Sequence, residues 1–332
     1  MTVDSSDTSP THRSPPVILP SSAAGKLVDW FAGHRKIVVA FSGGVDSSVV
    51  LAAALRSVAE RNVAQRSVAE SVVAVTARSP SVAAWQITQA ESIVKQLAAT
   101  HHIIRTDEVE SAAYRANDSS RCFHCKSTLY ESLEHWCRIQ GIEDATIVSG
   151  TNADDLGDYR PGIAAGDAAG VQKPLADLGF GKATVREIAS LFQLSNHDLP
   201  ASPCLASRIA YGVAVTPQRL RQVEEAEDFL REMGLETVRV RVHEGDLARI
   251  EVPIVHLTML TDEKVRSRLT RRFVELGFRY ITMDLQGFAS GSMNRKLVSL
   301  HNHAADVVNQ PTVVPTDIVS IGPPRMIRRE TQ

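Results

Sequence analysis

The sequence predicts an α/β protein: a parallel sheet flanked by helices, followed by a smaller C-terminal α/β domain. Short apolar runs alternate with longer amphipathic segments in the N-terminal part, a pattern typical of β-α units in a parallel sheet. After about Pro203 the pattern changes to a helix followed by strands with strict alternation of apolar and polar residues. With 332 residues, the chain is long enough to build two cores.

The expected borders follow shifts in composition. Residues 1–22 are rich in Ser, Thr and Pro and are expected to form a disordered leader. The first domain is expected over residues 23–203 and the smaller domain over residues 204–303. The Pro-rich stretch 304–332 lacks clear periodicity and is expected to be a flexible tail.

The overall composition favours a cytoplasmic protein that acts on a small molecule. There are 36 Lys and Arg against 38 Asp and Glu, whereas a protein with a large RNA substrate more often carries a basic excess. No stretch is apolar for long enough to span a bilayer, and the first residues lack the pattern of a secretory signal. Four cysteines are too few for a disulfide scaffold. We therefore expect no nucleic-acid partner and no membrane partner.

Three apolar runs predict the strands of the first domain: Lys36–Phe41, Ser71–Ala77 and Thr146–Gly150. The sequence RSVAE occurs between the first two, at Arg56–Glu60 and again at Arg66–Glu70. Two copies do not make a solenoid, so we interpret this stretch as an extended helix or a surface insertion.

Helices are predicted on both sides of the change in pattern. One has its buried face at helical spacing, formed by Val185, Ile188, Ala189 and Phe192. The next begins at Thr216, an N-cap residue followed by Pro217 in the first turn, and Gly234 provides a stop.

The strands of the smaller domain follow. The run Val238–Val242 alternates strictly, which places Arg239 and Arg241 on one face of a strand. Partner strands and the helix between them are expected at Ala248–Val252, Asp262–Leu276 and Tyr280–Leu285.

The segment Phe41–Ser48 (FSGGVDSS) lies between a strand and an apolar helix and predicts a phosphate site. Gly43 and Gly44 let the backbone turn sharply, so that its N–H groups approach an anion. Hydroxyl groups of Ser42, Ser47 and Ser48 and the N-terminus of the helix add to the site. Asp46 fits an anion site only if Mg²⁺ lies between its carboxylate and the phosphate. The alternative is an ordinary glycine-rich turn.

The run SGGVDS is not a Walker A loop, and it resembles the signature of the PP-loop ATP pyrophosphatases. The resemblance implies an adenine nucleotide alpha hydrolase-like fold. It also implies an enzyme that splits ATP between the α- and β-phosphates and leaves an adenylated substrate.

A second polar segment, SGTNADDLGDYRPG (Ser149–Gly162), follows the third expected strand, where the carboxyl ends of parallel strands gather a ligand. Its three carboxylates suit Mg²⁺ or a nucleotide, and the alternative is a solvated acidic turn. We assign nucleotide binding to Gly150, Thr151, Asn152 and Asp155, and to Thr76 near the end of the second strand.

Two cysteine motifs carry candidate chemistry. In SPCLASR, Cys204 lies near Arg208, and a thiol beside a guanidinium gains thiolate character. The alternative is a small buried hydrophobe. In RCFHCK, Cys122 and Cys125 form half of a zinc motif whose second half is missing, so we favour a structural thiol pair over a redox pair and expect no metal there.

These motifs, together with the late run DLQGFASGS (Asp284–Ser292), occur in the order found in the LarE family, which the chain resembles from about Gly25 to His303. The resemblance implies an ATP-dependent sacrificial sulfur transferase that acts on pyridinium-3,5-dicarboxylate mononucleotide, a nucleotide-like small molecule. It also implies that the product becomes a nickel-pincer cofactor and is handed over to a nickel-inserting enzyme. The family also implies a homo-oligomer.

In that family a substrate carboxylate is adenylated, a cysteine captures the acyl group, and cleavage of the cysteine C–S bond leaves dehydroalanine. Cys204 matches the sulfur donor and Arg208 is assigned to catalysis with it. Some members hold an iron–sulfur cluster with two further cysteines near this point. No cysteine follows Cys204 here, so no iron–sulfur cluster is expected.

The resemblance also favours a substrate site in the second domain. It consists of Ser207, Arg239, Arg241, Asp284 and Ser292, with the arginines on a phosphate or carboxylate. The alternative for the arginines is cross-strand pairing with Glu251. The chain departs from the family at Ala289, where a basic residue is common, which bears on how an anionic substrate is held.

Three other functions remain open. A PP-loop synthetase or amidotransferase would use ammonia and retain turnover without Cys204. A tRNA-thiolating enzyme shares the chemistry, but the near-neutral charge and the lack of an RNA-binding appendage count against it. A non-catalytic nucleotide sensor would bind ATP without releasing pyrophosphate.

Overall fold

The computed structural model describes residues 22–65, 71–157 and 161–289. Both sheets lie in one compact unit that ends at Phe288. The expected leader up to residue 21, the second RSVAE copy (Arg66–Glu70), Ser292 and the expected tail lie outside the described residues. The domain border at residues 203 and 204 stays a prediction.

The first sheet is parallel, with strand order β3-β2-β1-β4. Its strands are β1 (Lys36–Ala40), β2 (Ser71–Arg78), β3 (Thr100–Arg105) and β4 (Thr146–Val148). The predicted α/β class is confirmed, as are the three predicted strands β1, β2 and β4. The sequence did not predict β3, an edge strand that carries two histidines and only intermediate or exposed side chains.

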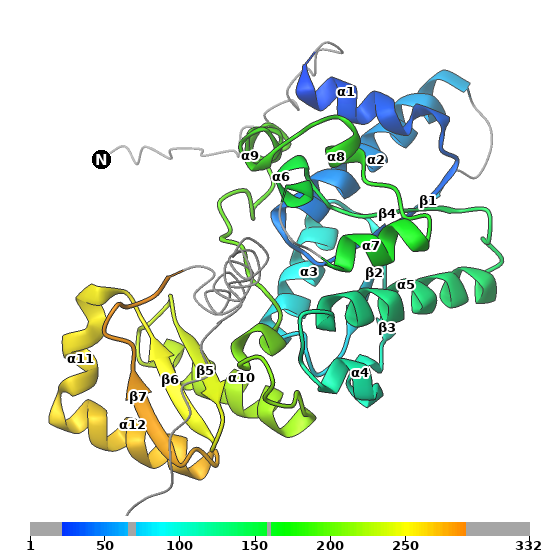
Figure 1. The fold of residues 1–332 in the computed structure, drawn as a ribbon. Coiled ribbons are helices and arrows are strands. Elements are labelled where there is room, and N and C mark those ends of the chain that lie inside the picture. The colour runs from blue at the N-terminus through cyan, green and yellow to red at the C-terminus, as the bar shows by residue number, and fades with distance from the viewer. Residues whose placement is uncertain (1–21, 66–70, 158–160, 290–332) are drawn as a thin grey trace, which may run out of the picture. The chain divides into compact units, whose positions relative to one another are not determined.

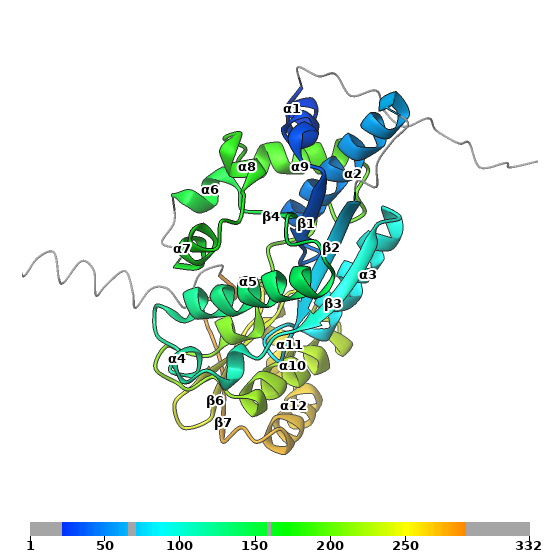
Figure 2. The ribbon, with the colours of Figure 1, turned by 90° about the vertical axis from the view of Figure 1, so that its right-hand side faces the viewer.

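Helices cover both faces of this sheet, as Figure 2 shows with α5 on one side and α2 and α3 on the other. On the face of α2, Val39 and Ala74 join the larger core, and on the face of α5, Val38 and Val73 join a smaller one. The helices of this part are α1 (Ala23–Trp30), α2 (Val45–Gln65), α3 (Ala84–Gln96), α4 (Ala112–Arg115), α5 (Arg121–Ile139), α6 (Ala153–Leu156), α7 (Pro161–Ala168), α8 (Pro174–Asp177) and α9 (Lys182–Leu191), with short 3₁₀ turns at Phe31–Gly33 and Glu108–Glu110.

The second sheet has the order β5-β6-β7, with β5 antiparallel to β6 and β6 parallel to β7 (Figure 1). Its elements are η3 (Leu205–Arg208), α10 (Pro217–Glu232), β5 (Arg239–His243), β6 (Leu247–Glu251), η4 (Ile254–His256), α11 (Leu257–Thr261), α12 (Glu263–Glu275) and β7 (Tyr280–Met283). The predicted helix start is confirmed, because the Thr216 hydroxyl accepts a hydrogen bond from the Arg219 N–H at 3.2 Å. The three predicted strands and the helix between them are also present.

Because side chains alternate between the two faces along each strand, the second sheet has one apolar face and one charged face. Val240 lies opposite Ile250 in the register and both are buried in a core with α10 and α12. Ala83, Val109 and Tyr114 of the N-terminal part belong to the same core. The apolar packing of the second sheet is therefore continuous with the loops that follow the strands of the first.

Candidate active site

The predicted phosphate loop turns between β1 and α2 as expected. Gly43 has φ +74°, and a Cβ there would lie 2.7 Å from the Ala90 Cα of α3, so glycine is required both by conformation and by space. The Ser47 hydroxyl donates to the Gly44 carbonyl at 3.1 Å and lies 3.2 Å from the Ser42 hydroxyl. These bonds hold the loop closed over the first turn of α2, where backbone N–H groups are free of helix partners.

Two further chain segments brace this loop. A Cβ at Gly150, after β4, would lie 2.6 Å from the Ser47 nitrogen, so the backbone after β4 touches the first turn of α2. Asn196 follows α9, and its Nδ2 donates to the Gly43 carbonyl and to the Ser48 hydroxyl, each at 2.9 Å. Asn196 is buried, with 4% of its surface exposed. Sequence reasoning did not identify Asn196, because it lies 153 residues from Gly43.

Carboxylates from the two strand ends meet beside the loop. Burial raises the pKa of Asp46 above its usual value, and the nearby charge of Asp155 raises it further. Asn152 donates to the Asp46 carboxylate at 3.3 Å and also caps α6, because its side chain accepts from the Asp155 N–H. Lys182 lies 4.0 Å from Asp155. The structure thus brings together Asp46, Asn152 and Asp155, which the sequence assigned to one site.

This arrangement fits Mg²⁺ with a nucleotide. Two carboxylates crowded in a half-buried site favour a cation between them, and Mg²⁺ takes one or two protein carboxylates and completes its shell with phosphate and water. Within the described ranges no group of three His, Cys, Asp or Glu side chains is arranged for a metal.

Thr76 lies on β2 beside the start of the loop. Its hydroxyl is 2.8 Å from Nε2 of His101 on β3, and the His101 ring makes an edge contact with Phe41. Burial lowers the pKa of His101, which favours the neutral imidazole. The hydroxyl of Thr76 is thereby already engaged, and its role toward a nucleotide stays a prediction. Thr151 shares a hydrogen bond of 3.1 Å with Ser149.

Cys204 precedes the short 3₁₀ turn η3, and several contacts fix this turn in space. The Leu205 N–H donates to the Ser81 carbonyl at 2.9 Å, and the Ala210 N–H donates to the Val242 carbonyl of β5 at 2.9 Å. Asn117 donates from one buried amide to three carbonyl groups, those of Ile209, Ala210 and Val213. The Cys204 side chain is half-buried. The candidate sulfur donor therefore lies directly before a turn that hydrogen bonds tie to several other segments.

Arg208 braces the same turn from inside. Its guanidinium donates to the Cys204 carbonyl at 3.0 Å, to the Pro203 carbonyl and to the Ser207 hydroxyl. It also forms an ion pair with Glu227 of α10 at 3.0 Å, with both side chains buried. In the structure Arg208 thus binds the Cys204 carbonyl and the Glu227 carboxylate. These contacts do not test its predicted role in catalysis, which stays a prediction.

The RCFHCK motif at the start of α5 lies against this turn. Arg121 donates to the Ala206 carbonyl at 2.9 Å, and Cys125 packs against the same core as Cys204. Burial raises the pKa of Cys125 to about 12, and a nearby Cys204 thiolate contributes to the increase. Cys122 is exposed. The sequence placed these thiols in separate motifs, and only the fold brings them to one place.

The charged face of the second sheet holds the predicted substrate residues. Arg241 is paired with buried Glu251 at 2.8 Å, the partner that the alternative interpretation named. Arg249 joins Glu251 at 3.0 Å and Asp284 at 3.5 Å. Arg239 lies over the Phe288 ring at 5.4 Å, and burial lowers its pKa to about 10. Arg241 and Asp284 thus belong to an ion-pair chain, and Ser292 lies outside the described residues.

Comparison with known proteins identifies the family. No protein-family model matches the chain. An uncharacterised protein of Synechocystis sp. is 37% identical over 82% of this chain and 96% of its own length. The pyridinium-3,5-bisthiocarboxylic acid mononucleotide synthase of Lactiplantibacillus plantarum is 34% identical over 79% of this chain and 90% of its own. The chain belongs to the LarE family. An uncharacterised protein of Methanocaldococcus jannaschii is 27% identical over 77% of this LarE-family chain.

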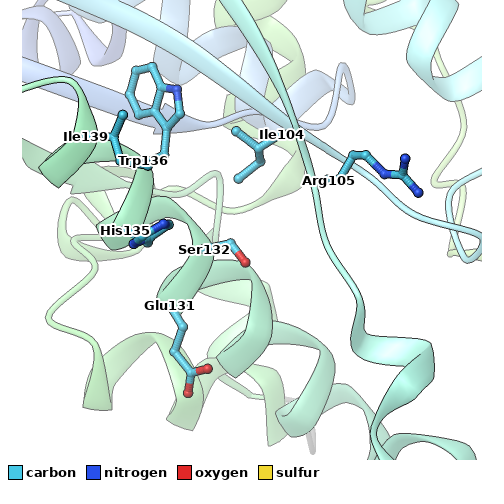
Figure 3. A pocket seen from close by; sticks show the side chains of 7 residues that line it. All are labelled: Ile104, Arg105, Glu131, Ser132, His135, Trp136 and Ile139. Carbon is cyan, nitrogen blue, oxygen red and sulfur yellow. The ribbon is translucent and has the colours of Figure 1, made fainter.

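A cavity of about 460 Å³ lies elsewhere on this LarE-family protein, between the edge strand β3 and α5 (Figure 3). Ile104, Trp136 and Ile139 form its apolar part, and Arg105 and Glu131 are charged residues of its lining. It contains none of the residues assigned to nucleotide, thiol or substrate. The candidate site is therefore located by the contacts of the predicted phosphate loop and by the carboxylates of Asp46 and Asp155. This cavity is not part of it.

In the described part of the LarE-family chain, no helix is both long and apolar enough to cross a membrane.

Proposed function

We propose that this LarE-family protein is an ATP-dependent sulfur transferase that acts on pyridinium-3,5-dicarboxylate mononucleotide, with Cys204 as the sacrificial sulfur donor. The observation that supports it most is the partly exposed Cys204 thiol at the start of η3, where Arg208 binds the Cys204 carbonyl and Arg121 binds the Ala206 carbonyl. A relative named as the synthase of the bisthiocarboxylic acid mononucleotide supports the same reaction class.

In the proposed first step ATP converts a substrate carboxylate into an acyl-adenylate. The carboxylate oxygen forms a bond to the α-phosphorus, and the bond to the β-phosphate oxygen breaks, which releases pyrophosphate. The N–H groups of the phosphate loop and the N-terminus of α2 would bind the phosphates. Asp46 and Asp155 would hold Mg²⁺, which supplies positive charge to the phosphate oxygens.

In the proposed second step the Cys204 sulfur attacks the acyl carbon. A C–S bond forms, the C–O bond to the phosphate breaks, and AMP leaves with the electron pair, so that a thioester joins substrate and protein. A base then removes the Cα proton of Cys204, the Cβ–S bond breaks, and the sulfur leaves on the substrate as a thiocarboxylate. Residue 204 becomes dehydroalanine, so the protein is consumed.

Anionic groups of the substrate would be bound on the charged face of the second sheet. Arg239 is the residue best suited to this, because among the described residues no carboxylate lies within ion-pair distance of it. Arg241 already shares Glu251 and would act through that pair. We place Ser207 and Asp284 at the edge of this region, as the family resemblance implies. We further propose a cytoplasmic homo-oligomer that passes its product to a nickel-inserting enzyme.

The test is the intact mass of the purified protein before and after incubation with ATP, Mg²⁺ and the pyridinium dicarboxylate mononucleotide. We expect the loss of one hydrogen sulfide equivalent, localised to Cys204 by peptide mapping and absent from Cys204→Ala. Cys137→Ala is the matched control, because Cys137 is buried in the core under α5 and should leave the mass change intact.

Two outcomes would contradict the proposal. An unchanged mass with stoichiometric thiolated product would mean that sulfur comes from outside the protein. Turnover of ATP with ammonia in Cys204→Ala would instead identify a PP-loop synthetase or amidotransferase.

A further inference from the structure

Three arginines among the described residues are buried, and they differ in what neutralises them. Arg208 is paired with Glu227, and Arg241 with Glu251. Arg121 has 6% of its surface exposed, yet no carboxylate of the described residues lies within ion-pair distance of it. A buried charge without a counter-ion is costly, so such a group is expected to face an anion at some stage of the reaction.

The contacts of Arg121 show where that anion would be. One guanidinium nitrogen donates to the Asn117 side-chain oxygen and to the Ala206 carbonyl, at 2.5 and 2.9 Å. Both acceptors are neutral. Ala206 lies in η3, two residues from Cys204, and Asn117 fixes the continuation of the same turn. The guanidinium is therefore anchored to the turn that carries the sulfur donor.

Beside these two acceptors, the guanidinium lies 5.8 Å from the centre of the Tyr211 ring and close to the thiols of Cys204 and Cys122 and the phenol of Tyr114. Burial by itself would lower the pKa of Arg121, yet the pKa is raised, because Cys204, Cys122 and Tyr114 are near enough to stabilise the cation when they carry negative charge. Tyr114 is buried, its hydroxyl is 2.6 Å from that of Ser81, and burial raises its pKa. Tyr114 therefore stays neutral. The anions left to Arg121 are a sulfur and a bound substrate.

We propose that Arg121 is the cation that assists the sulfur-transfer step. It stabilises the negative charge at the Cys204 sulfur and at the acyl oxygen during attack on the acyl-adenylate. This inference rests on the proposed function. During the attack, charge moves from sulfur to the acyl oxygen and leaves with AMP, while Arg121 stays protonated throughout. Arg208 cannot supply this charge as freely, because Glu227 already neutralises it.

The experiment compares how fast Cys204 reacts with iodoacetate, an anion, and with iodoacetamide, its neutral analogue, by peptide mapping of the full-length protein. A cation beside the sulfur speeds the anionic reagent selectively, so the ratio of the two rates reports local charge and not merely access to the thiol. We expect the ratio to fall by roughly tenfold in Arg121→Gln, which keeps a donor for the two oxygen acceptors. Arg121→Lys should keep most of it.

Arg61→Met is the matched control. Its guanidinium also binds carbonyl oxygens, those of Phe31 and His34 at 2.9 Å, but on α2 and apart from the thiols. The ratio should not change there. An unchanged ratio in Arg121→Gln would overturn the inference. If Arg121→Gln does not fold, the wild-type ratio at Cys204 is compared with that of glutathione, and a ratio no higher than glutathione's would overturn it as well.

A second readout separates this inference from the proposed function. Arg121→Gln should still release pyrophosphate from ATP and should lose sulfur transfer by roughly tenfold to a hundredfold. If the wild-type protein transfers no sulfur, the proposed function fails whatever the alkylation ratio shows. If the wild type transfers sulfur and Arg121→Gln does so equally fast, the role of Arg121 is wrong and the proposed function stands.

Discussion

Replacing Asn196 by alanine is expected to weaken ATP binding while leaving the thiol side of the site unchanged. Asn196 reaches the phosphate loop from the segment after α9, where its amide donates to the Gly43 carbonyl and to the Ser48 hydroxyl, each at 2.9 Å. Gly43 is the residue of the loop with φ +74°, so the amide holds the turn at its least common backbone conformation.

The magnitude follows from the two bonds. Each neutral hydrogen bond contributes about 0.5–1.5 kcal/mol net, so losing both removes about 2 kcal/mol of the preference for the binding conformation. If that preference is restored when ATP binds, the dissociation constant rises roughly 30-fold. The assay is a calorimetric titration with ATP and Mg²⁺, together with thermal unfolding of each variant.

Asn117→Ala is the matched control. Asn117 is an equally buried asparagine that donates to three carbonyl groups, but beside η3 and not beside the phosphate loop. It should lower stability and slow sulfur transfer while leaving the ATP dissociation constant unchanged. The reasoning is refuted if folded Asn196→Ala binds ATP as tightly as the wild type, or if both variants weaken ATP binding equally.

Three further predictions concern the same site. Asp46→Asn should abolish the Mg²⁺-dependent release of pyrophosphate. Because burial raises the folded-state pKa of Asp46 above 3.8, ionising this carboxyl costs stability in the metal-free protein. The metal-free variant should therefore melt higher than wild type at neutral pH, and the difference should disappear below pH 3.8, which thermal unfolding against pH would show. Gly150→Ala should lower stability by about 1–3 kcal/mol and weaken ATP binding, measured by denaturant unfolding and titration, because the added Cβ would lie 2.6 Å from the Ser47 nitrogen. Protein purified without air should contain no iron and show no visible absorption; stoichiometric iron would contradict our expectation that no cluster is bound.

Local patterns were sufficient for most of the secondary structure. The runs that became β1 and β2 are apolar along their length because both faces of a central parallel strand are covered, and such runs are legible in sequence. β3 lies at the sheet edge, where a strand needs fewer buried residues. Its polar residues give no apolar run, so the sequence did not predict this strand. The start of α10 was predictable because a cap involves neighbours only, Thr216 and Arg219.

In the candidate site, too, the features set by neighbouring residues could be predicted from the sequence, and the contacts between distant residues could not. The predicted phosphate loop is one contiguous run whose glycines and serines bond one another, so its turn could be predicted from the sequence alone. Cys204 was selected from a family motif of the same local kind. The residues that hold these pieces come from far along the chain: Asn196 lies 153 residues from Gly43, and Arg121 lies 85 from Ala206. Whether an arginine is free or neutralised also depends on distant carboxylates. Only the tertiary structure decided that Arg208 is paired with Glu227, whereas Arg121 has no carboxylate partner among the residues that the structure describes. The reason is that burial and pairing are properties of the packed chain and not of any short segment.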